Sequence, residues 1–194
     1  MSRIIHFVRH GTHAEVGRVL SGRSEIALDA RGRDEAEARA RRLDGLPIAS
    51  LHSSPRRRAQ ETAAAIADRR GLKIASAPAL DEIDFGAFTG RSFADLDGDP
   101  SWQGWNAERG LARCPGGETM AEAVARAIAY LAAIPAAQTP AVCVSHCDII
   151  RGIVADLLGL DYGRMFAFDC NPASLTTVAL GSAGARLVTL NAPA

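Results

Sequence analysis

Short apolar stretches alternate along this chain with longer segments in which apolar and polar residues are mixed. The apolar stretches predict four buried strands, at residues 4–8, 48–52, 73–77 and 141–145. The mixed segments predict four helices, at residues 33–43, 55–70, 118–134 and 147–158. Strands that alternate with helices form a parallel sheet with helices on both faces, because parallel strands are joined by right-handed crossovers.

The end of the chain has a different pattern. Residues 174–180 and 186–190 alternate between apolar and polar side chains, with Gly181 and Gly184 between them. This alternation predicts an antiparallel hairpin. The expected fold is therefore a three-layer α/β/α structure with a mostly parallel, doubly wound sheet and an antiparallel edge strand.

Two local signals place segments next to this sheet. Ser53-Ser54-Pro55 predicts a helix start, with a serine as cap and proline in the first turn. Residues 12–31 contain the breakers Gly17 and Gly22 and show neither helical nor strand periodicity. We expect them to form a loop over a site at the carboxyl end of the first strand.

Composition and charge narrow the class of protein. The chain has 194 residues, 47% of them hydrophobic, as expected for one globular domain with a sizeable core. Lysine plus arginine and aspartate plus glutamate both number 22, which favours neither a nucleic-acid partner nor an anionic membrane. No apolar run reaches the length of a membrane span, and Met1-Ser2-Arg3 shows no signal-peptide pattern. We therefore expect a cytoplasmic protein.

The cysteines carry no sign of a structural framework. Their positions show no Cys-x-x-Cys pairing: Cys114, Cys143, Cys147 and Cys170. Most of them stand in apolar or strand-like surroundings, which is typical of free thiols in a reducing compartment. A disulfide framework or a zinc knuckle is not expected.

Reactive residues follow each of the four predicted parallel strands. His10 follows the first, Arg58 the second, Glu82 the third and His146 the fourth. Ligands of open α/β sheets bind outside the carboxyl ends of the strands, so these four residues are expected to meet on one rim.

The residues of this rim suit phosphate-ester chemistry. His10 can attack phosphorus as a neutral imidazole, and the neighbouring Arg9 and Arg58 disfavour its protonation. Arg9, Arg58 and His146 can hold the phosphoryl oxygens. Glu82 can protonate the leaving alkoxide and then activate water, although Asp81 and Asp84 beside it are further candidates for the acid. Of the other histidines in the predicted strands, His6 is interpreted as structural, and the role of His52 is left open.

The ordered set of motifs resembles the histidine phosphatase superfamily, in its phosphoglycerate-mutase-like branch. The resemblance covers nearly the whole chain and rests on Arg9-His10-Gly11, residues 53–63, residues 82–86, Pro115-Gly116-Gly117-Glu118 and Val144-Ser145-His146. It implies a phosphoglycerate-mutase-like fold, His10 as the phosphorylated residue and Glu82 as the proton donor. It also implies a phosphate pocket of Arg9, His10, Arg58 and His146, with a backbone donor at Cys147. Members usually carry serine or threonine two residues beyond the glycine, where this chain has His13.

Parts of the sequence also fit two other chemistries. His10, His13 and Glu15 could form a metal cluster, but their spacing is not diagnostic and further ligands are not evident. A cysteine-based phosphatase needs five residues between its cysteine and arginine, whereas Cys147 and Arg151 are separated by three.

The sequence as a whole predicts a single domain over residues 1–194, with residues 83–117 as a short insertion over the site. Its expected function is that of a metal-independent phosphomonoester hydrolase for a small phosphorylated metabolite, with no cofactor. Mutases of the family have a longer insertion, which favours the phosphatase, but a phosphoglycerate-type mutase stays an alternative. So does a non-catalytic module that binds a phosphate ligand. The physiological substrate and the oligomeric state are open, including a homodimer formed through the edge hairpin.

Overall fold

The structure, a computed structural model, describes residues 2–182 and 184–194. The strands are β1 (Arg3–Arg9), β2 (Ser50–Ser53), β3 (Ile74–Ser76), β4 (Ala141–Ser145), β5 (Leu175–Gly181) and β6 (Gly184–Ala192). The α-helices are α1 (Ala30–Arg42), α2 (Arg57–Arg70), α3 (Phe93–Asp97), α4 (Pro100–Ala107), α5 (Met120–Ala133) and α6 (Cys147–Leu157). Short 3-10 helices are η1 (Pro78–Leu80), η2 (Gly86–Phe88), η3 (Ala136–Gln138) and η4 (Tyr162–Ala167).

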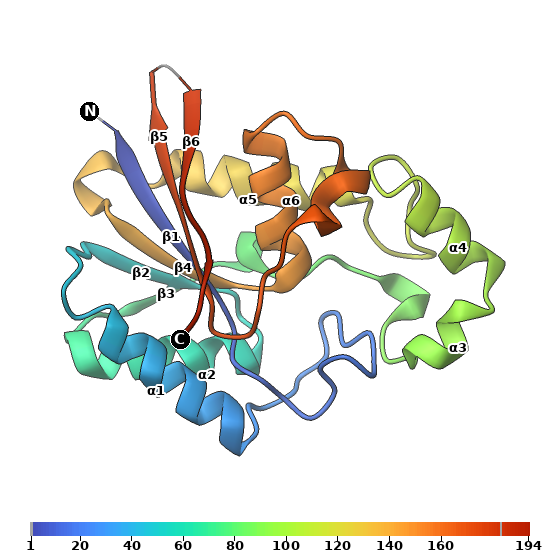
Figure 1. Cartoon of the computed structure of the whole chain (residues 1–194), viewed down its shortest axis with the longest axis horizontal. Helices are drawn as coiled ribbons and strands as arrows, with labels where there is room; N and C mark the ends of the chain where they lie inside the picture. Colours follow the sequence, from blue (N-terminus) through green and yellow to red (C-terminus); the bar gives the residue numbers. More distant parts are fainter. Residues whose placement is uncertain (1, 183) are drawn as a thin grey trace.

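The described strands form one mixed sheet in the order β3-β2-β4-β1-β5-β6 (Figure 1). Strands β3, β2, β4 and β1 are parallel to one another, whereas β5 pairs antiparallel with β1 and with β6. The predicted fold class and the antiparallel hairpin at the sheet edge are therefore confirmed.

Strand β1 lies inside the sheet, between β4 and β5. Ile5, Phe7 and Val8 are fully buried, as expected for a strand covered on both faces. His6 is also buried, and its Nδ1 lies 2.9 Å from the Thr177 hydroxyl of β5. The hydrogen bond gives this buried imidazole a partner and supports its structural interpretation.

Helices cover the sheet in two layers. On one face, Ala63 and Ile66 of α2 belong to a buried cluster with Val8 and Val144. On the other face, side chains of α5 and α6 form a larger buried cluster with Phe7 and other residues of β1 and β4. Apolar burial on both faces stabilises the three layers and fixes which end of each strand is open to solvent.

Helix α2 begins two residues later than the Ser-Ser-Pro turn predicts. Its N-cap is Arg56, which has extended backbone angles and no side-chain capping bond. The Ser54 hydroxyl accepts from the Arg56 amide at 3.3 Å, just before the helix, and also contacts His146 and Asp81. No serine is the N-cap of α2, so the predicted serine cap is wrong. The Ser54 side chain, directly after β2, therefore contributes to the polar contacts of the site and does not cap the helix.

The segment between β3 and α5 carries η2, α3 and α4 and extends to one side of the sheet (Figure 1). Its two ends approach closely: the Ala87 amide donates to the Pro115 carbonyl at 2.9 Å. Gly86 has a φ of +52°, and a Cβ there would lie 2.1 Å from the Pro115 carbonyl oxygen. Only glycine permits this backbone conformation at such a contact.

Aromatic packing consolidates the same segment. Trp102 and Trp105 of α4 stack at 5.2 Å, and their edges meet Phe88 and Phe85. Within the described residues, no helix combines the length and the apolar character needed to cross a bilayer.

Candidate active site

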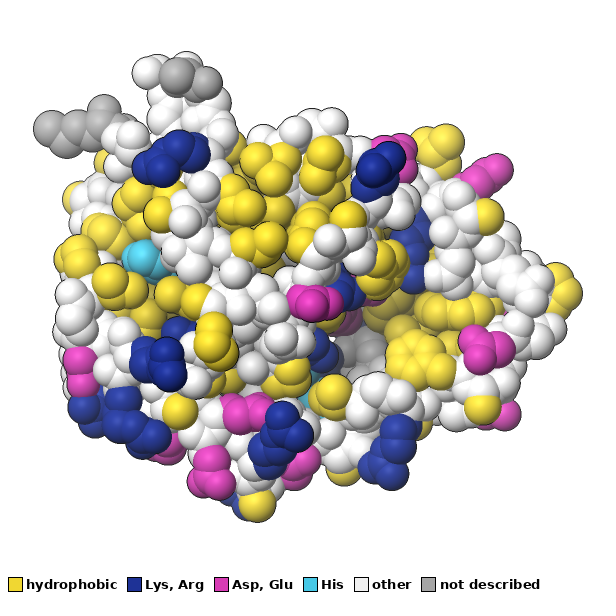
Figure 2. All heavy atoms as spheres, viewed as in Figure 1, with side chains coloured by type: hydrophobic (Ala, Val, Ile, Leu, Met, Phe, Trp, Pro, Cys, Tyr) yellow, Lys and Arg dark blue, Asp and Glu magenta, His cyan; other side chains and the backbone are white. Residues whose placement is uncertain are grey.

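A cavity of about 240 Å³ opens at the carboxyl ends of the parallel strands. Figure 2 shows a hollow on this face, between the body of the protein and the segment that carries α3 and α4. The lining residues come from five segments that are distant in sequence: the end of β1, the loop before α1, the start of α2, residues 82–109, and α6 with η4. Arg9, His10, Arg58, Glu82 and Cys147 of the predicted site all line the cavity.

His10 stands directly after β1, where its amide donates to the Ser145 carbonyl of β4 at 3.0 Å. Its ring is buried, with 3% exposed. Nδ1 lies 2.8 Å from the Gly11 carbonyl oxygen. Because a carbonyl can only accept, Nδ1 carries the proton and Nε2 holds the lone pair.

The surroundings of His10 keep the ring neutral. Burial lowers its pKa well below the ordinary value, and the guanidinium groups of Arg58 and Arg9 lower it further. The hydrogen bond to Gly11 opposes this shift. A neutral imidazole with a free Nε2 is the form that can act as a nucleophile.

Two arginines flank this histidine, and protein carbonyls fix both. Arg9 donates to the Cys170 carbonyl at 2.6 Å. Arg58 is 1% exposed and donates to the carbonyls of Ser24, at 2.8 Å, and Gly22, at 2.5 Å. The Nε atoms of both arginines are buried without a hydrogen-bond partner among the described residues. Two oriented cations with unsatisfied donors suit an anionic ligand.

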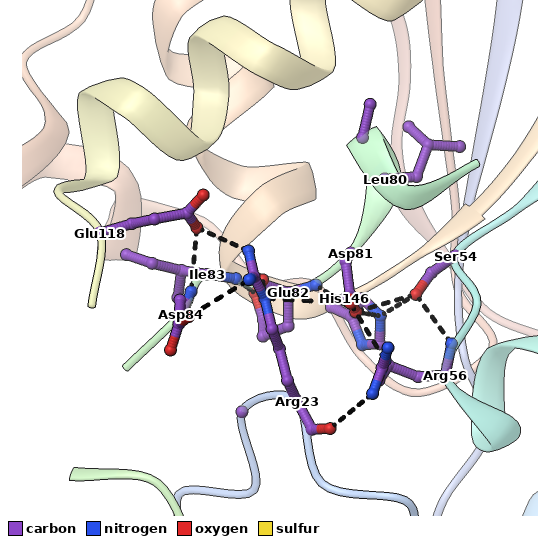
Figure 3. Close-up of polar contacts among 12 residues, drawn as sticks. Arg23, Ser54, Arg56, Leu80, Asp81, Glu82, Ile83, Asp84, Glu118 and His146 are labelled. Atoms are coloured by element: carbon purple, nitrogen blue, oxygen red, sulfur yellow. Dashed lines mark hydrogen bonds and ion pairs between the residues drawn. The ribbon is translucent and has the colours of Figure 1, made fainter. Parts of the chain in front are cut away.

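His146 follows β4 and packs against His10, with 5.1 Å between ring centroids. Its Nδ1 accepts from Arg58 at 3.1 Å, and its Nε2 donates to the Ser54 hydroxyl at 2.7 Å. Ser54 in turn donates to Asp81 at 3.1 Å, which completes a chain of polar contacts (Figure 3). Both ring nitrogens therefore contact protein groups. His146 is thus joined to Arg58, which lines the cavity, and its direct contact with a phosphoryl group stays a prediction.

Glu82 is 7% exposed and lines the cavity. Burial raises the pKa of its carboxyl to about 8, and the negative charge of Asp148 contributes to the rise. Oε1 accepts from the Ile83 amide at 3.0 Å. At neutral pH this carboxyl is largely protonated, as a general acid must be.

The two alternative acids are engaged in ion pairs. Asp81 lies 3.0 Å from the Arg56 guanidinium, and Asp84 lies 3.2 Å from Arg23 (Figure 3). Arg23 also donates to the backbone carbonyl of Glu82 at 3.0 Å and so helps to fix that residue. Glu82 is the one of these three carboxyls that lines the cavity. The geometry favours it as the acid.

Cys147 begins α6 and lies in contact with Cys170, whose carbonyl is 3.6 Å from the Cys147 sulfur. This contact and burial both raise the pKa of the Cys147 thiol. A protonated thiol is a poor nucleophile, which agrees with rejecting a cysteine-based mechanism.

Several residues of the cavity were not predicted from the sequence. His13 lies 5.2 Å from His10 between ring centroids, and burial lowers its pKa to about 4. Phe85 and Trp102 belong to the buried core and also line the cavity. The remaining polar members are Asp148, Arg109 and Arg151. Of these residues, only Asp148 and Arg151 had a signal in the sequence: their spacing places both on one face of the predicted helix that follows His146.

Sequence comparisons place the chain among phosphate-processing proteins. The profile of the histidine phosphatase superfamily (branch 1) matches residues 5–193. A probable phosphoglycerate mutase of Yersinia enterocolitica is 34% identical over 165 residues, which cover 80% of this chain and 75% of the relative. Phosphoserine phosphatase 1 of Hydrogenobacter thermophilus is 28% identical over 175 residues, which cover 86% and 82%.

Solved structures agree with this placement. A mycobacterial glucosyl-3-phosphoglycerate phosphatase matches with a TM-score of 0.87 at 25% identity, over 99% of this chain and 100% of that one. The alpha-ribazole phosphatase of Shigella flexneri matches with a TM-score of 0.86 at 25% identity, over 97% and 96%. The chain belongs to branch 1 of the histidine phosphatase superfamily.

Proposed function

We propose that this enzyme hydrolyses phosphomonoesters of small metabolites through a phosphohistidine at His10. The observation that carries the proposal is the arrangement around His10. Its protonated Nδ1 is held by Gly11, and its free Nε2 belongs to a ring that burial and the charges of Arg58 and Arg9 keep neutral. A protonated carboxyl, Glu82, lines the same cavity.

In the first step, Nε2 of His10 attacks the phosphorus atom, and the bond from phosphorus to the ester oxygen breaks. Glu82 donates its proton to the leaving alkoxide, so the alcohol departs neutral and Glu82 becomes a carboxylate. Arg9 and Arg58 hold the phosphoryl oxygens as charge develops on them. His146 positions Arg58 through the contact at its Nδ1.

In the second step, the Glu82 carboxylate takes a proton from water while the water oxygen attacks phosphorus. The bond between phosphorus and Nε2 breaks, inorganic phosphate forms, and Glu82 is protonated again. Protons balance over the two steps without a metal or a cofactor. The raised pKa of Glu82 suits both roles, because it lies close to neutral pH.

A mutase would use the same first step and return the phosphoryl group to its substrate. One relative is a probable phosphoglycerate mutase, while others are phosphatases. The short segment between Glu82 and α5 favours the phosphatase. Incubation with 3-phosphoglycerate decides between them: release of inorganic phosphate supports hydrolysis, and appearance of 2-phosphoglycerate with little free phosphate supports the mutase. Phosphate binding with neither product would indicate a non-catalytic module.

The proposal also includes the domain organisation and the cellular location of the enzyme. We infer that residues 1–194 act as one domain, with residues 83–117 as a cover over the site, because Phe85, Phe93, Trp102 and Arg109 line the cavity from this segment. The equal numbers of acidic and basic residues support a small phosphorylated substrate rather than a nucleic-acid partner. The free cysteines support a cytoplasmic location, because free thiols are typical of a reducing compartment.

A further inference from the structure

The cavity has a second cationic end that the proposed phosphoryl transfer does not use. Arg109 follows α4, Arg151 lies on α6, and both line the cavity. Their guanidinium carbons stand 4.3 Å and 5.0 Å from the centroid of the same ring, that of Phe166 in η4. Arg109 also stacks on Trp105, at 4.2 Å. Aromatic packing thus brings two like charges together at one wall of the cavity.

The two guanidinium groups are incompletely paired. Arg109 is 7% exposed, and its Nη1 lies 3.5 Å from an Asp148 carboxylate oxygen without forming a hydrogen bond. The nearest carboxylate to Arg151 is that of Asp169, at 3.8 Å, whose side chain is 78% exposed and therefore screened by water. The Nε of Arg151 is buried and has no partner among the described residues. Buried donors of this kind call for an acceptor.

The charges along the cavity fall into two groups. A phosphoryl dianion matches Arg9 and Arg58, since His10 and Glu82 are neutral near pH 7. At the other end, Arg109 and Arg151 face the carboxylate of Asp148, whereas the exposed Asp169 is not among the residues that line the cavity. One positive charge therefore remains there, which corresponds to one monoanionic group on the substrate.

We propose that Arg109 and Arg151 bind a carboxylate on the alcohol part of the substrate, so that the preferred substrates are phosphomonoesters of hydroxy acids. This inference rests on the proposed function and deepens it by naming the substrate class. The planar guanidinium matches a carboxylate with paired hydrogen bonds. A second phosphate would bring two negative charges against one net positive charge, so bisphosphates are poorer substrates.

The test compares esters that differ by one carboxylate. O-phospho-L-serine is paired with O-phosphoethanolamine, and 3-phosphoglycerate with glycerol 3-phosphate. The wild type is expected to show a kcat/KM at least about tenfold higher for the carboxylated member of each pair, since a charged hydrogen bond contributes about 1.5–3 kcal/mol. 2,3-bisphosphoglycerate is expected to be used less well than 3-phosphoglycerate.

Variants assign the preference to these arginines. Arg151→Gln and Arg109→Gln should bring both ratios close to one, chiefly through a higher KM for the carboxylated ester, whereas p-nitrophenyl phosphate, which has no carboxylate, should lose much less activity than the carboxylated esters. Arg151→Lys should restore part of the ratio. Arg113→Gln is the matched control, because Arg113 lies in the same segment but pairs with Glu122 outside the cavity. Arg151 is less buried than Arg109, so its variant covers the case in which Arg109→Gln fails to fold.

Ratios close to one in the wild type, or ratios unchanged in Arg151→Gln, would overturn the carboxylate site. A preference for the bisphosphate would overturn it in favour of a second phosphate site. Calorimetric binding of each ester pair to His10→Ala separates this inference from the proposed function. If no ester is hydrolysed, the proposed function fails, but tighter binding of the carboxylated esters would still support the site and equal binding would refute it.

Discussion

The floor and the outer wall of the cavity are built in different ways. The floor consists of Arg9, His10 and Arg58, which lie at or just after strands β1 and β2 and are held by backbone carbonyls. The wall consists of residues 82–109 with α6 and η4, and its charged groups are held by aromatic rings and by one another. Rigid strand ends suit bond-making, whereas a wall of packed side chains can vary with the substrate.

The largest effect is expected at the floor. His10→Ala removes the nucleophile and should lower kcat for p-nitrophenyl phosphate by at least about a thousandfold. The fold should persist, because in the described part of the chain the wild-type ring forms one local hydrogen bond, to Gly11, and no long-range one. Steady-state kinetics with a circular-dichroism melt measures both. Retention of more than one tenth of the activity in a folded variant would remove His10 from the mechanism.

The next largest effect is expected where floor and wall meet. Glu82→Gln keeps the size of the side chain but cannot donate a proton to the leaving group. Esters of alkyl alcohols should slow by about a hundredfold or more, and p-nitrophenyl phosphate much less, because its leaving group needs no proton. Equal losses for both kinds of ester would show that the acid is another residue.

Asp148 allows the wall to be tested without touching the floor. Glu82 must be protonated for the first step, so activity falls as pH rises through its pKa, at about 8. Asp148 raises this pKa by repelling the ionised carboxylate. Asp148→Asn should therefore move the alkaline limb of the kcat/KM profile to lower pH, by up to about one pH unit. An unchanged alkaline limb would show that Asp148 does not raise the pKa of Glu82. Asp161→Asn is a suitable control, because Asp161 is an exposed residue just before η4.

The smallest effect concerns stability. The folded-state pKa of His13, about 4, lies below the ordinary value of 6.5, so the unfolded chain binds more protons between these values. The free energy of unfolding should consequently fall as pH drops from about 6.5 toward 4. His13→Gln should make this fall less steep in urea titrations at several pH values. Part of the fall should persist, because the pKa values of His10 and His146 are also lowered. Parallel curves for the two proteins would contradict this role for His13.

The same contrast explains what the sequence could predict. The fold and the grouping of His10, Arg58 and Glu82 follow from local signals, because apolar runs define strands and the residue after each run lies at a known edge. His146 reaches the same edge, but its contacts with Arg58 and Ser54 depend on side-chain packing between strands. The order of residues along the chain does not encode that packing directly.

The outer wall was largely unpredicted. Arg109 reaches the cavity because its guanidinium packs on Trp105 and on Phe166. These two aromatic residues are 61 positions apart in the sequence. Contacts between residues so far apart in the sequence produce no periodic pattern from which they could be predicted. Similarly, the Ser54 hydroxyl could cap α2 or contact His146, and only the three-dimensional position of β4 decides between them. Tertiary contacts overrode the local capping signal.

The central claim is that His10 accepts the phosphoryl group on Nε2. We would mix the enzyme with a ³²P-labelled phosphomonoester, quench it in alkali within one turnover, and map the acid-labile label by peptide sequencing and phosphohistidine standards. The account predicts label on Nε2 of His10, because Nδ1 is occupied by its hydrogen bond to Gly11. Turnover with no trapped label, with label on Nδ1, or with label that persists in His10→Ala would contradict it.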